Sequence, residues 1–600
     1  MANFLNSFED RAITLPSPAS VQLGPESRFG ERFQGNISYI QYLHDRYGEE
    51  MLEAYATRHY SPGKLLERVW DGEYAGKWLD AATRTAVTTG DETLLTKVDI
   101  FASSLTRYQQ PDGYMGVKLP TDRILNGWEQ SWDLWNQWNA LIGLLTHYEL
   151  RGECASLEAT SHLGDWIVQT YGPIQDENAL FFQGGLTNVV VIGQLVRLYR
   201  HTRNEDLVEF VRQVIQYYPP IQQMLSSGEP YLAHPYMLSA ILEGISEFAQ
   251  VKRNYEILTK VEQVWGGLVE KQLFPTGSLG VSENMKDEPL FDVPDGQLQE
   301  TCATTEWIFF TQRLYEITGR VKYIEALENT CYNALLAAQS TDGMKWCYYT
   351  PLRYHKDWFH GPTRCCFWSG PRGIARIPQL IYATKGNSIY INFFESSEAT
   401  LTTAGGEVRV TQNSEFPKHG KSKVTLITSS GWSGELYIRV PEWAADFRTI
   451  LNENPAPNIS NREGYFIMSL HDSNEFQIEI RFDIPLVLEK LEANNYVMCR
   501  GPEVLSIDTR DNIDTWLGTQ SDLISIPEEI ALLTLDSSQR YQWTGPVDTY
   551  GSRQRYLVFL DDKRTSEPRG LILTPYADAG NEGAAFRTVF RLDAKEKKKA

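Results

Sequence analysis

The chain has 600 residues, of which 42% are hydrophobic and 12% aromatic, so it is large enough for several buried cores. Its formal net charge of −21 argues against nucleic acid or an anionic membrane surface as a partner, because both are densely negative. We therefore expect a multidomain globular protein.

The first residues and the cysteines bear on the compartment. The segment MANFLNSFEDRAITLP has early acidic residues and no apolar stretch of signal-peptide length. No run of ~18 apolar residues predicts a membrane span, and seven scattered cysteines do not resemble a disulfide framework. These features predict a cytoplasmic location, whereas removal of a signal would leave a periplasmic or secreted one open.

One unit recurs through the first two thirds of the chain: an amphipathic helix, a short turn and a second helix. The turns are expected at residues 88–95, 150–157, 201–208, 251–258 and 317–324. Their separations of roughly fifty to sixty-six residues are typical of stacked or ring-closed helical hairpins. With a sixth hairpin from the opening segment, the pattern predicts an (α/α)6 toroid barrel over residues 1–383, in which glycine-rich loops surround the mouth of a central pocket.

The hydrophobic pattern changes near residue 384. Short runs of period two, such as SIYINFF, EVRVTQN and EFQIEIRF, are separated by Gly, Pro, Asn and Ser. This pattern predicts one or two antiparallel β-sandwich domains over residues 384–600, which end in the charged tail AKEKKKA.

Four possible soft-metal ligands lie in two short segments. Glu300 and Cys302 stand in LQETCATTEW, and the adjacent pair Cys365 and Cys366 stands in GPTRCCFWSG. Three thiolates and one carboxylate complete a tetrahedral zinc shell, although adjacent cysteines chelate awkwardly and free cysteines are often simply buried. Both segments are expected at helix starts, the second just before a helix over residues 372–384, and helix N-termini favour anionic groups.

Spacing alone leaves two chemistries open. In the first, zinc is structural and a separate pair of carboxylates performs acid–base catalysis on a sugar. In the second, zinc lowers the pKa of one thiol and fixes its direction, so that the thiolate attacks carbon.

Several motifs resemble one known family. ETCATTEW, the CC pair with Arg372 six residues beyond Cys366, and GIARIPQLIYAT are similar to glycoside hydrolase family 127, the β-L-arabinofuranosidases. RFDIPL and CRGPEVLSID resemble the β-domain segments of that family, so the resemblance extends from about residue 64 to about residue 510. It implies an (α/α)6 barrel joined to β-sandwiches and a retaining exo-glycosidase with zinc bound by one Glu and three Cys.

Transferred by position, the resemblance implies that Glu300, Cys302, Cys365 and Cys366 bind zinc and that Cys365 is the nucleophile. A carboxylic acid upstream would protonate the leaving oxygen and later deprotonate water. Glu283, in SENM, and Glu288 both lie in the corresponding stretch, and we favour Glu283.

The expected sugar pocket departs from the family pattern. Trp132 stands in place of a family histidine, Asn188 in place of another, and His234 in AHPYML matches a third. Arg353, in YYTPLRYH, replaces an acidic residue and would recognise a carboxylate on the sugar, unless it pairs with a nearby Asp or Glu.

The sequence thus predicts an exo-glycosidase that releases a terminal L-arabinofuranose-like sugar, carboxylated if Arg353 contacts it, from plant or pectic oligosaccharides. The alternatives are a carboxylate-pair hydrolase or lyase with structural zinc, and a glycan-binding protein without turnover. A homodimer through the β domains is allowed, but no self-complementary patch identifies it.

Overall fold

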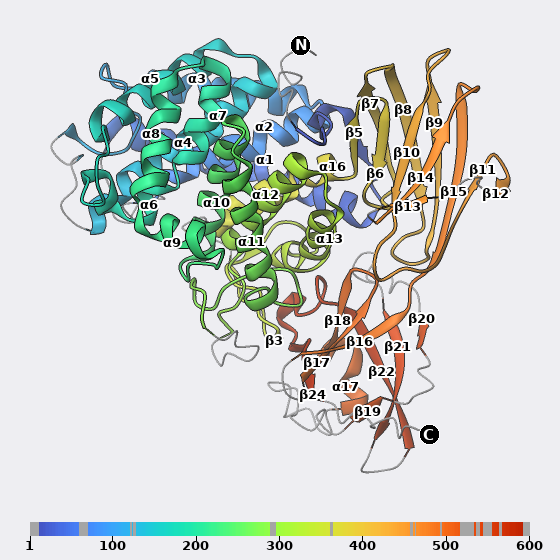
Figure 1. The fold of residues 1–600 in the computed structure, drawn as a ribbon. Coiled ribbons are helices and arrows are strands. Elements are labelled where there is room, and N and C mark those ends of the chain that lie inside the picture. The colour runs from blue at the N-terminus through green and yellow to red at the C-terminus, as the bar shows by residue number, and fades with distance from the viewer. Residues whose placement is uncertain are drawn as a thin grey trace.

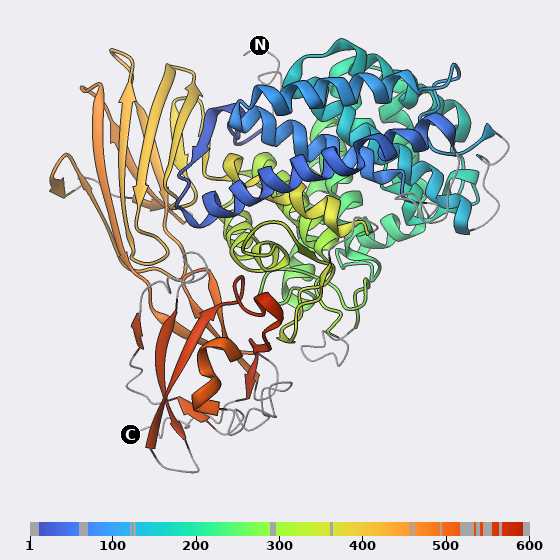
Figure 2. The same cartoon turned by 180° about the vertical axis from the view of Figure 1, so that it is seen from behind.

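The computed structural model has a helical domain followed by two β-sheet domains (Figures 1 and 2). The structure describes residues 11–58, 70–120, 123, 128–287, 296–359, 364–455, 460–462, 464–491, 495–516, 533–535, 541–543, 555–562 and 567–591. Within these residues, no helix is long and apolar enough to cross a bilayer.

The five predicted turns each join two helices. The helices are α1 (Arg28–Thr57), α2 (Glu73–Thr89), α3 (Glu92–Arg107), α4 (Trp128–Arg151), α5 (Cys154–Tyr171), α6 (Leu186–Val189), α7 (Ile192–Thr202), α8 (Glu205–Tyr217), α9 (Pro219–Ser227), α10 (Pro235–Val251), α11 (Tyr255–Lys271), α12 (Thr301–Thr318), α13 (Val321–Thr330), α14 (Leu336–Ala338), α15 (Cys366–Ile374) and α16 (Ile377–Leu380). The first turn shows the local cause. Gly90 ends α2 with a left-handed φ of 66°, and the side chain of Asp91 accepts the N–H groups of Thr93 and Leu94 to begin α3.

Six helices of the described chain contact one another in a closed cycle, in the order α2, α4, α7, α10, α12, α15 and back to α2. The helices α3, α5, α8, α11 and α13 pack outside their chain neighbours, and α1 packs on α15 and α2. The cyclic helices are buried almost all round, whereas an outer helix such as α3 buries only one apolar face. Close approach needs small residues: a Cβ on Gly76 of α2 would lie 1.9 Å from the carbonyl oxygen of Asn139 in α4.

The end of the helical domain differs from the prediction of one helix over residues 372–384. Helix α15 begins earlier, at Cys366, and residues 382–385 form strand β5. Pro371 and Pro378 interrupt the helical hydrogen bonds, and the aromatic and β-branched residues of IYAT favour the extended chain.

The first β domain consists of two packed sheets. Their strands are β1 (Val21–Leu23), β5 (Tyr382–Lys385), β6 (Ser388–Ile391), β7 (Ser397–Thr403), β8 (Gly406–Ser414), β9 (Lys421–Thr428), β10 (Gly434–Arg439), β11 (Ala445–Leu451), β12 (Asn454–Pro455), β13 (Ser460–Arg462), β14 (Tyr465–Leu470) and β15 (Glu475–Asp483). One sheet has the order β1-β7-β8-β9-β15-β11-β12 and the other β13-β14-β10-β6-β5. Phe447 of β11 packs on Phe466 of β14 across the two sheets, with ring centroids 6.0 Å apart.

Two features of this domain were not predicted. Strand β1 comes from the N-terminal segment and pairs with β7, so residues assigned to the barrel complete a sheet. Strands β6 and β10 are parallel, which corrects the prediction of purely antiparallel sheets. The chain passes through β7, β8 and β9 between them, and this long connection permits parallel pairing.

The C-terminal domain is built on one larger sheet that touches the helical domain. Its strands are β16 (Leu486–Lys490), β17 (Asn495–Arg500), β18 (Glu503–Asp508), β19 (Leu533–Leu535), β20 (Tyr541–Trp543), β21 (Tyr556–Asp562), β22 (Glu567–Pro575), β23 (Phe586–Arg587) and β24 (Phe590–Arg591), with helix α17 (Thr509–Trp516) beside them. Strand β23 pairs with β3 (Arg353–Tyr354), which belongs to a long loop of the helical domain. The C-terminal sheet therefore holds that loop at its edge, and Figure 1 shows β3 beside this sheet.

Candidate active site

The two ligand segments predicted from the sequence meet in space. Glu300 is the N-cap of α12, Cys302 lies in its first turn, and Cys365 and Cys366 begin α15. One ligand atom from each of the four side chains lies within 4.8 Å of the others. We call these four residues the Glu/Cys cluster.

The sulfur and carboxylate atoms of the cluster contact one another directly. The Sγ atoms of Cys366 and Cys302 are 3.4 Å apart, and the Cys366 and Cys365 sulfurs lie 3.5 and 3.7 Å from Oε1 of Glu300. The adjacent cysteines therefore converge on one carboxylate, although neighbouring side chains usually diverge. Ser369, one turn along α15, contacts the Cys302 sulfur through its hydroxyl at 3.2 Å.

Charge is distributed unevenly within the cluster. Burial raises the pKa of Glu300, Cys302 and Cys366 well above their ordinary values. Hydrogen bonds from Cys302 and Cys366 instead hold the pKa of Cys365 well below that of a free thiol. Cys365 is thus the thiol best suited to be a thiolate.

The cluster has the chemistry of a zinc site. It offers three thiols and one carboxylate, a normal ligand set for tetrahedral zinc. Oε2 of Glu300 is buried and has no hydrogen-bond partner, and an unsatisfied buried carboxylate oxygen is costly unless a cation or donor meets it. The donor set and this orphaned oxygen together fit a bound zinc ion.

Glu283 lies at the tip of a tight turn that faces the cluster. Val281 and Asn284 exchange both backbone hydrogen bonds, and the two central residues, Ser282 and Glu283, have φ values of 48° and 64°. Such left-handed pairs usually use Asn or Gly, so Ser and Glu here carry backbone strain of roughly 1–2 kcal/mol each. The Glu283 side chain remains 38% exposed and can meet a substrate or water.

A tyrosine that the sequence analysis did not single out joins the two predicted catalytic residues. The Tyr348 hydroxyl donates to Oε1 of Glu283 at 2.6 Å and lies 3.5 Å from the Cys365 sulfur. Tyr349 makes a longer hydrogen bond to the same carboxylate oxygen, at 3.3 Å. Only the adjacent pair of tyrosines before TPLRY in the sequence could have pointed to this position.

The loop that carries Tyr348 is held against the start of α12. Tyr349 forms a β-bridge with Glu300. The side chain of Gln299, whose φ is 56°, donates to the carbonyl of Thr350 at 2.8 Å, and the Tyr576 hydroxyl from the C-terminal domain donates to the same carbonyl at 2.7 Å. The C-terminal sheet domain thus helps to position this side of the site.

His234, which the family resemblance places near the sugar, lies beside Glu300 and Glu283. It is the N-cap of α10, and its Nε2 lies 3.6 Å from Oε2 of Glu300 and 3.9 Å from Oε2 of Glu283. Burial lowers the pKa of His234, so the neutral imidazole is favoured. Its other ring nitrogen, Nδ1, is buried without a hydrogen-bond partner.

A buried ion pair beside the cluster was also missed from the sequence. Nζ of Lys77 lies 2.8 Å from Oε2 of Glu73, and Nε1 of Trp135 donates to the same oxygen at 2.7 Å. Burial opposes the charge of Lys77, but Glu73 and the cluster thiols Cys302 and Cys365 raise its pKa well above the ordinary value. A cation therefore faces the thiols from α2.

The other predicted pocket residues have mixed placements. Trp132 is half-buried and packs on Trp70 and Trp135, with ring centroids 5.3 and 5.2 Å away. Asn188 is fully buried, and its amide donates to the carbonyl of Phe181 at 2.9 Å, so it holds the turn before α6.

Arg353 lies on strand β3, opposite Arg587 of β23, and its guanidinium packs over the ring of Tyr354 at 4.4 Å. Its contact with a sugar carboxylate stays a prediction. Glu288, the alternative acid, lies outside the described residues.

Comparisons with known proteins agree with this combination of fold and site, which is that of a glycoside hydrolase. The family model described as Beta-L-arabinofuranosidase, GH127 catalytic domain, matches residues 20–379, and the GH127 middle domain matches residues 388–484. The chain belongs to glycoside hydrolase family 127.

Relatives over the full length support the assignment. A non-reducing end beta-L-arabinofuranosidase from Bifidobacterium longum is 21% identical over 598 residues, which cover 86% of this chain and 88% of the relative. A solved GH127 beta-arabinofuranosidase superposes with a TM-score of 0.81 at 18% identity and covers 97% of this chain and 98% of its own. A GH127 beta-L-arabinofuranosidase from Geobacillus stearothermophilus T6 superposes with a TM-score of 0.79 at 19% identity, over 96% and 100% of the two chains. These structures share the fold.

Proposed function

We propose that the protein is a retaining exo-glycosidase that releases a terminal β-L-arabinofuranose-like sugar from plant or pectic oligosaccharides. Cys365 is the nucleophile and Glu283 the acid/base, and Glu300, Cys302, Cys365 and Cys366 hold a zinc ion. The observation that carries the proposal is the Tyr348 hydroxyl, which contacts both the Cys365 sulfur and the Glu283 carboxylate beside four converging metal ligands.

The proposal includes the architecture. The closed cycle of α2, α4, α7, α10, α12 and α15, each with an outer partner, supports an (α/α)6 toroid over residues 1–383 with the β domains over residues 384–600. The helix N-termini at one end of this ring then display the site. A homodimer and a cytoplasmic location remain predictions, which size-exclusion chromatography and cell fractionation would check.

When bound, zinc would keep the Cys365 sulfur ionised and fixed in direction. The residues of the chain do the rest. Lys77 supplies positive charge from α2, and the Ser369 hydroxyl holds the Cys302 sulfur in place. Tyr348 holds the Glu283 carboxyl near the sulfur so that both face the same bond.

The reaction then follows in two balanced steps. The Cys365 thiolate attacks the anomeric carbon and forms a carbon–sulfur bond, while the bond to the leaving oxygen breaks and Glu283 gives that oxygen its proton. Water next attacks the same carbon, Glu283 takes the water proton, and the carbon–sulfur bond breaks to regenerate the thiolate. Two inversions at one carbon give net retention.

His234, Trp132, Asn188 and Arg353 are proposed to shape the sugar pocket, and Arg353 favours a sugar with a carboxylate. A matched pair of substrates tests this role: an aryl L-arabinofuranoside and the same glycoside oxidised to a uronate. Arg353→Gln should lower kcat/KM for the uronate by about tenfold or more, because a bidentate contact is lost, and leave the neutral glycoside unchanged. Equal or faster cleavage of the neutral glycoside by the unaltered protein would contradict the proposal that Arg353 selects a carboxylated sugar.

The nucleophile is tested by trapping. The Glu283→Gln variant should react with an aryl β-L-arabinofuranoside whose leaving group needs no proton, and then release the sugar slowly because no base activates water. Acid quenching and peptide mass spectrometry should find the pentosyl group on Cys365. Exchange of the exposed thiol, Cys154→Ser, in the same background should leave the adduct intact.

Cys365→Ser in that background should abolish the adduct. A pentosyl group on an aspartate or glutamate would favour a carboxylate-pair hydrolase. Sugar binding with no release and no adduct, at high protein concentration and long times, would favour a non-catalytic glycan-binding protein.

A further inference from the structure

The end of the helical ring away from the Glu/Cys cluster contains a polar cavity of about 370 Å³. The cluster lies at the N-terminal starts of α12 and α15, whereas the cavity is lined by side chains farther along α2, α4, α7, α10, α12 and α15 and by the N-terminal residues 11 and 14–18. Seven arginine and five glutamate side chains of the described chain line it. Its volume is that of a small-molecule site.

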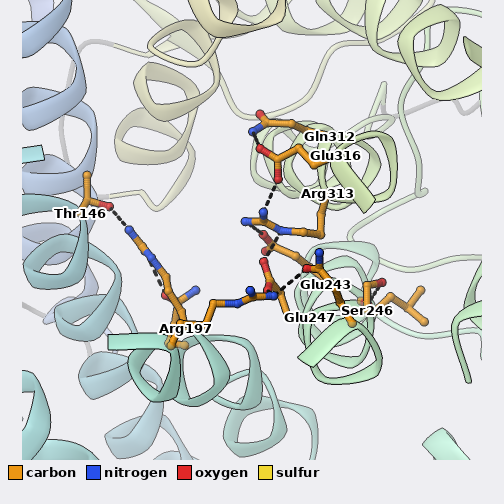
Figure 3. Close-up of polar contacts among 12 residues, drawn as sticks. Thr146, Arg197, Glu243, Ser246, Glu247, Gln312, Arg313 and Glu316 are labelled. Atoms are coloured by element: carbon orange, nitrogen blue, oxygen red, sulfur yellow. Dashed lines mark hydrogen bonds and ion pairs between the residues drawn. The ribbon is translucent and has the colours of Figure 1, made fainter. Parts of the chain in front are cut away.

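Most of these charges neutralise one another. Arg313 contacts Glu247 and Glu316, as Figure 3 shows, and both nitrogens of the Arg197 fork reach the Glu149 carboxylate, at 2.6 and 2.8 Å. These pairs hold the ends of neighbouring ring helices together. They explain much of the network without any ligand.

Arg376 does not fit this account. Among the residues that the structure describes, it is the cavity arginine with no carboxylate at ion-pair distance, and its Nε is buried without a hydrogen-bond partner. The guanidinium packs over the ring of Phe309 at 4.6 Å. Burial and the nearby Arg84 lower the pKa of Arg376 to about 9, because both oppose its positive charge.

A second side chain in the cavity has a buried acceptor without a hydrogen-bond donor. Gln312 is 3% exposed, and its amide nitrogen donates to Glu316 at 3.4 Å, while its amide oxygen has no donor (Figure 3). A buried acceptor without a donor costs about 1–3 kcal/mol, so a ligand hydroxyl there would be favourable. Within the cavity, Arg376 therefore lacks an anionic partner, and the Gln312 amide oxygen lacks a donor such as a hydroxyl.

We propose that this cavity is a second ligand site, for a small hydroxylated carboxylate such as a hydroxy acid or sugar acid. The ligand carboxylate would pair with the Arg376 guanidinium, and a ligand hydroxyl would donate a hydrogen bond to the amide oxygen of Gln312. The carboxylates of Glu149 and Glu243 would accept hydrogen bonds from further hydroxyls. The site requires neither zinc nor Cys365.

Isothermal titration of the full chain in low salt tests the proposal, with D-galacturonate as the probe. One molecule should bind per chain, and neutral D-galactose and inorganic sulfate should bind at least tenfold more weakly. Arg376→Gln should weaken galacturonate binding at least tenfold and Gln312→Leu severalfold, while exchange of an exposed arginine, Arg409→Gln, should change nothing. Arg353→Gln, which removes the proposed carboxylate contact of the sugar pocket, should bind galacturonate as the unaltered protein does, which separates the two sites.

Three results would overturn the proposal. They are no binding of galacturonate, equal binding of galactose or sulfate, and unchanged binding by Arg376→Gln. If Arg376→Gln does not fold by circular dichroism, Arg376→Lys and Gln312→Leu carry the test. Loss of binding in Arg353→Gln, with Arg376 variants unaffected, would place the probe in the catalytic pocket instead.

Discussion

The two ends of the helical ring carry opposite chemistry on the same helices. At the N-terminal ends of α10, α12 and α15 stand His234, Glu300 and Cys365, and toward the C-terminal ends of the ring helices stand guanidinium groups such as Arg200 and Arg313. A helix carries partial positive charge at its N-terminus and partial negative charge at its C-terminus. The thiols and the carboxylate of the cluster thus lie at helix N-termini, whereas the other mouth holds arginines together with their glutamate partners.

The ends also differ in which of their polar groups are left unsatisfied. The arginine end is mostly a paired network, in which Glu247 alone contacts Arg11, Arg200 and Arg313. The cysteine end leaves Oε2 of Glu300 and Nδ1 of His234 buried without hydrogen bonds, and it stores strain at Glu283. Unsatisfied and strained groups concentrate where ligands bind, whereas satisfied networks support the fold.

The largest expected effect is at the cysteine end. Cys365→Ser should lower kcat on the order of 10⁴-fold or more, because it removes the proposed covalent nucleophile. Steady-state assays on an aryl β-L-arabinofuranoside measure it, with Cys154→Ser as the control that keeps full activity. Retention of zinc and full activity by Cys365→Ser would assign the chemistry to carboxylates.

The second effect is on stability and concerns the buried ion pairs that join α2, α12 and α15. The Arg372 side chain is buried and lies 2.9 Å from Asp80 and 2.8 Å from Glu306. Arg372→Met leaves Glu306 without this cation, so the free energy of unfolding should fall by about 3–5 kcal/mol. Urea unfolding measures the loss. A change as small as that of the exposed Arg409→Met would mean that these ion pairs add little to the stability of the fold.

Acid should weaken the arginine end. Burial opposes the charge of Glu247, but Arg200, Arg313 and Arg11 outweigh it and lower its pKa to about 2. The folded state then binds fewer protons than the unfolded state, so the stabilisation of about 3 kcal/mol is complete above pH ~4.5 and is lost as pH falls toward ~2. The stability difference between the unaltered protein and Glu247→Gln should therefore shrink on acidification.

Urea unfolding at a series of pH values measures that difference. The exposed Glu158→Gln provides the matched control and should show a small, flat difference. A difference for Glu247→Gln that grows toward low pH would contradict the ion-pair account.

The smallest expected effect is a change in kcat at the cysteine end. Tyr348→Phe removes the hydroxyl between Cys365 and Glu283, and a hydrogen bond to a charged group contributes about 1.5–3 kcal/mol, so kcat should fall about 10-fold to 100-fold. Tyr349→Phe should cost less, because its bond to Glu283 is longer. The reverse order would reassign the residue that positions the acid.

The sequence was informative where local patterns repeat or where motifs are short. The five helical turns follow from Gly and Asx residues at helix ends, and the Glu/Cys cluster follows from two motifs that both lie at helix starts. The partners of the cluster were not predictable in this way. Tyr348 lies in an irregular loop. In the sequence Lys77 resembles any helix lysine, and only the structure shows that α2 is buried on nearly all sides.

Other errors have the same origin in long-range contacts. Strand β1 pairs with β7, which lies more than 370 residues later in the chain. Strand β1 has three residues, too few for a period-two pattern to be recognised in the sequence. Free cysteines are often buried, but Cys154 is exposed at the start of α5. The arginine cavity draws single residues from separate helices, so only closure of the ring reveals it.

Zinc content per chain, measured by elemental analysis on protein purified under reducing conditions without added metal, tests the central claim most directly. We predict about one zinc ion per chain, its loss in Cys302→Ser, and its retention in Arg376→Gln at the other end of the ring. Absence of zinc, with all seven thiols free in a thiol titration, would contradict the account and reduce the cluster to buried cysteines.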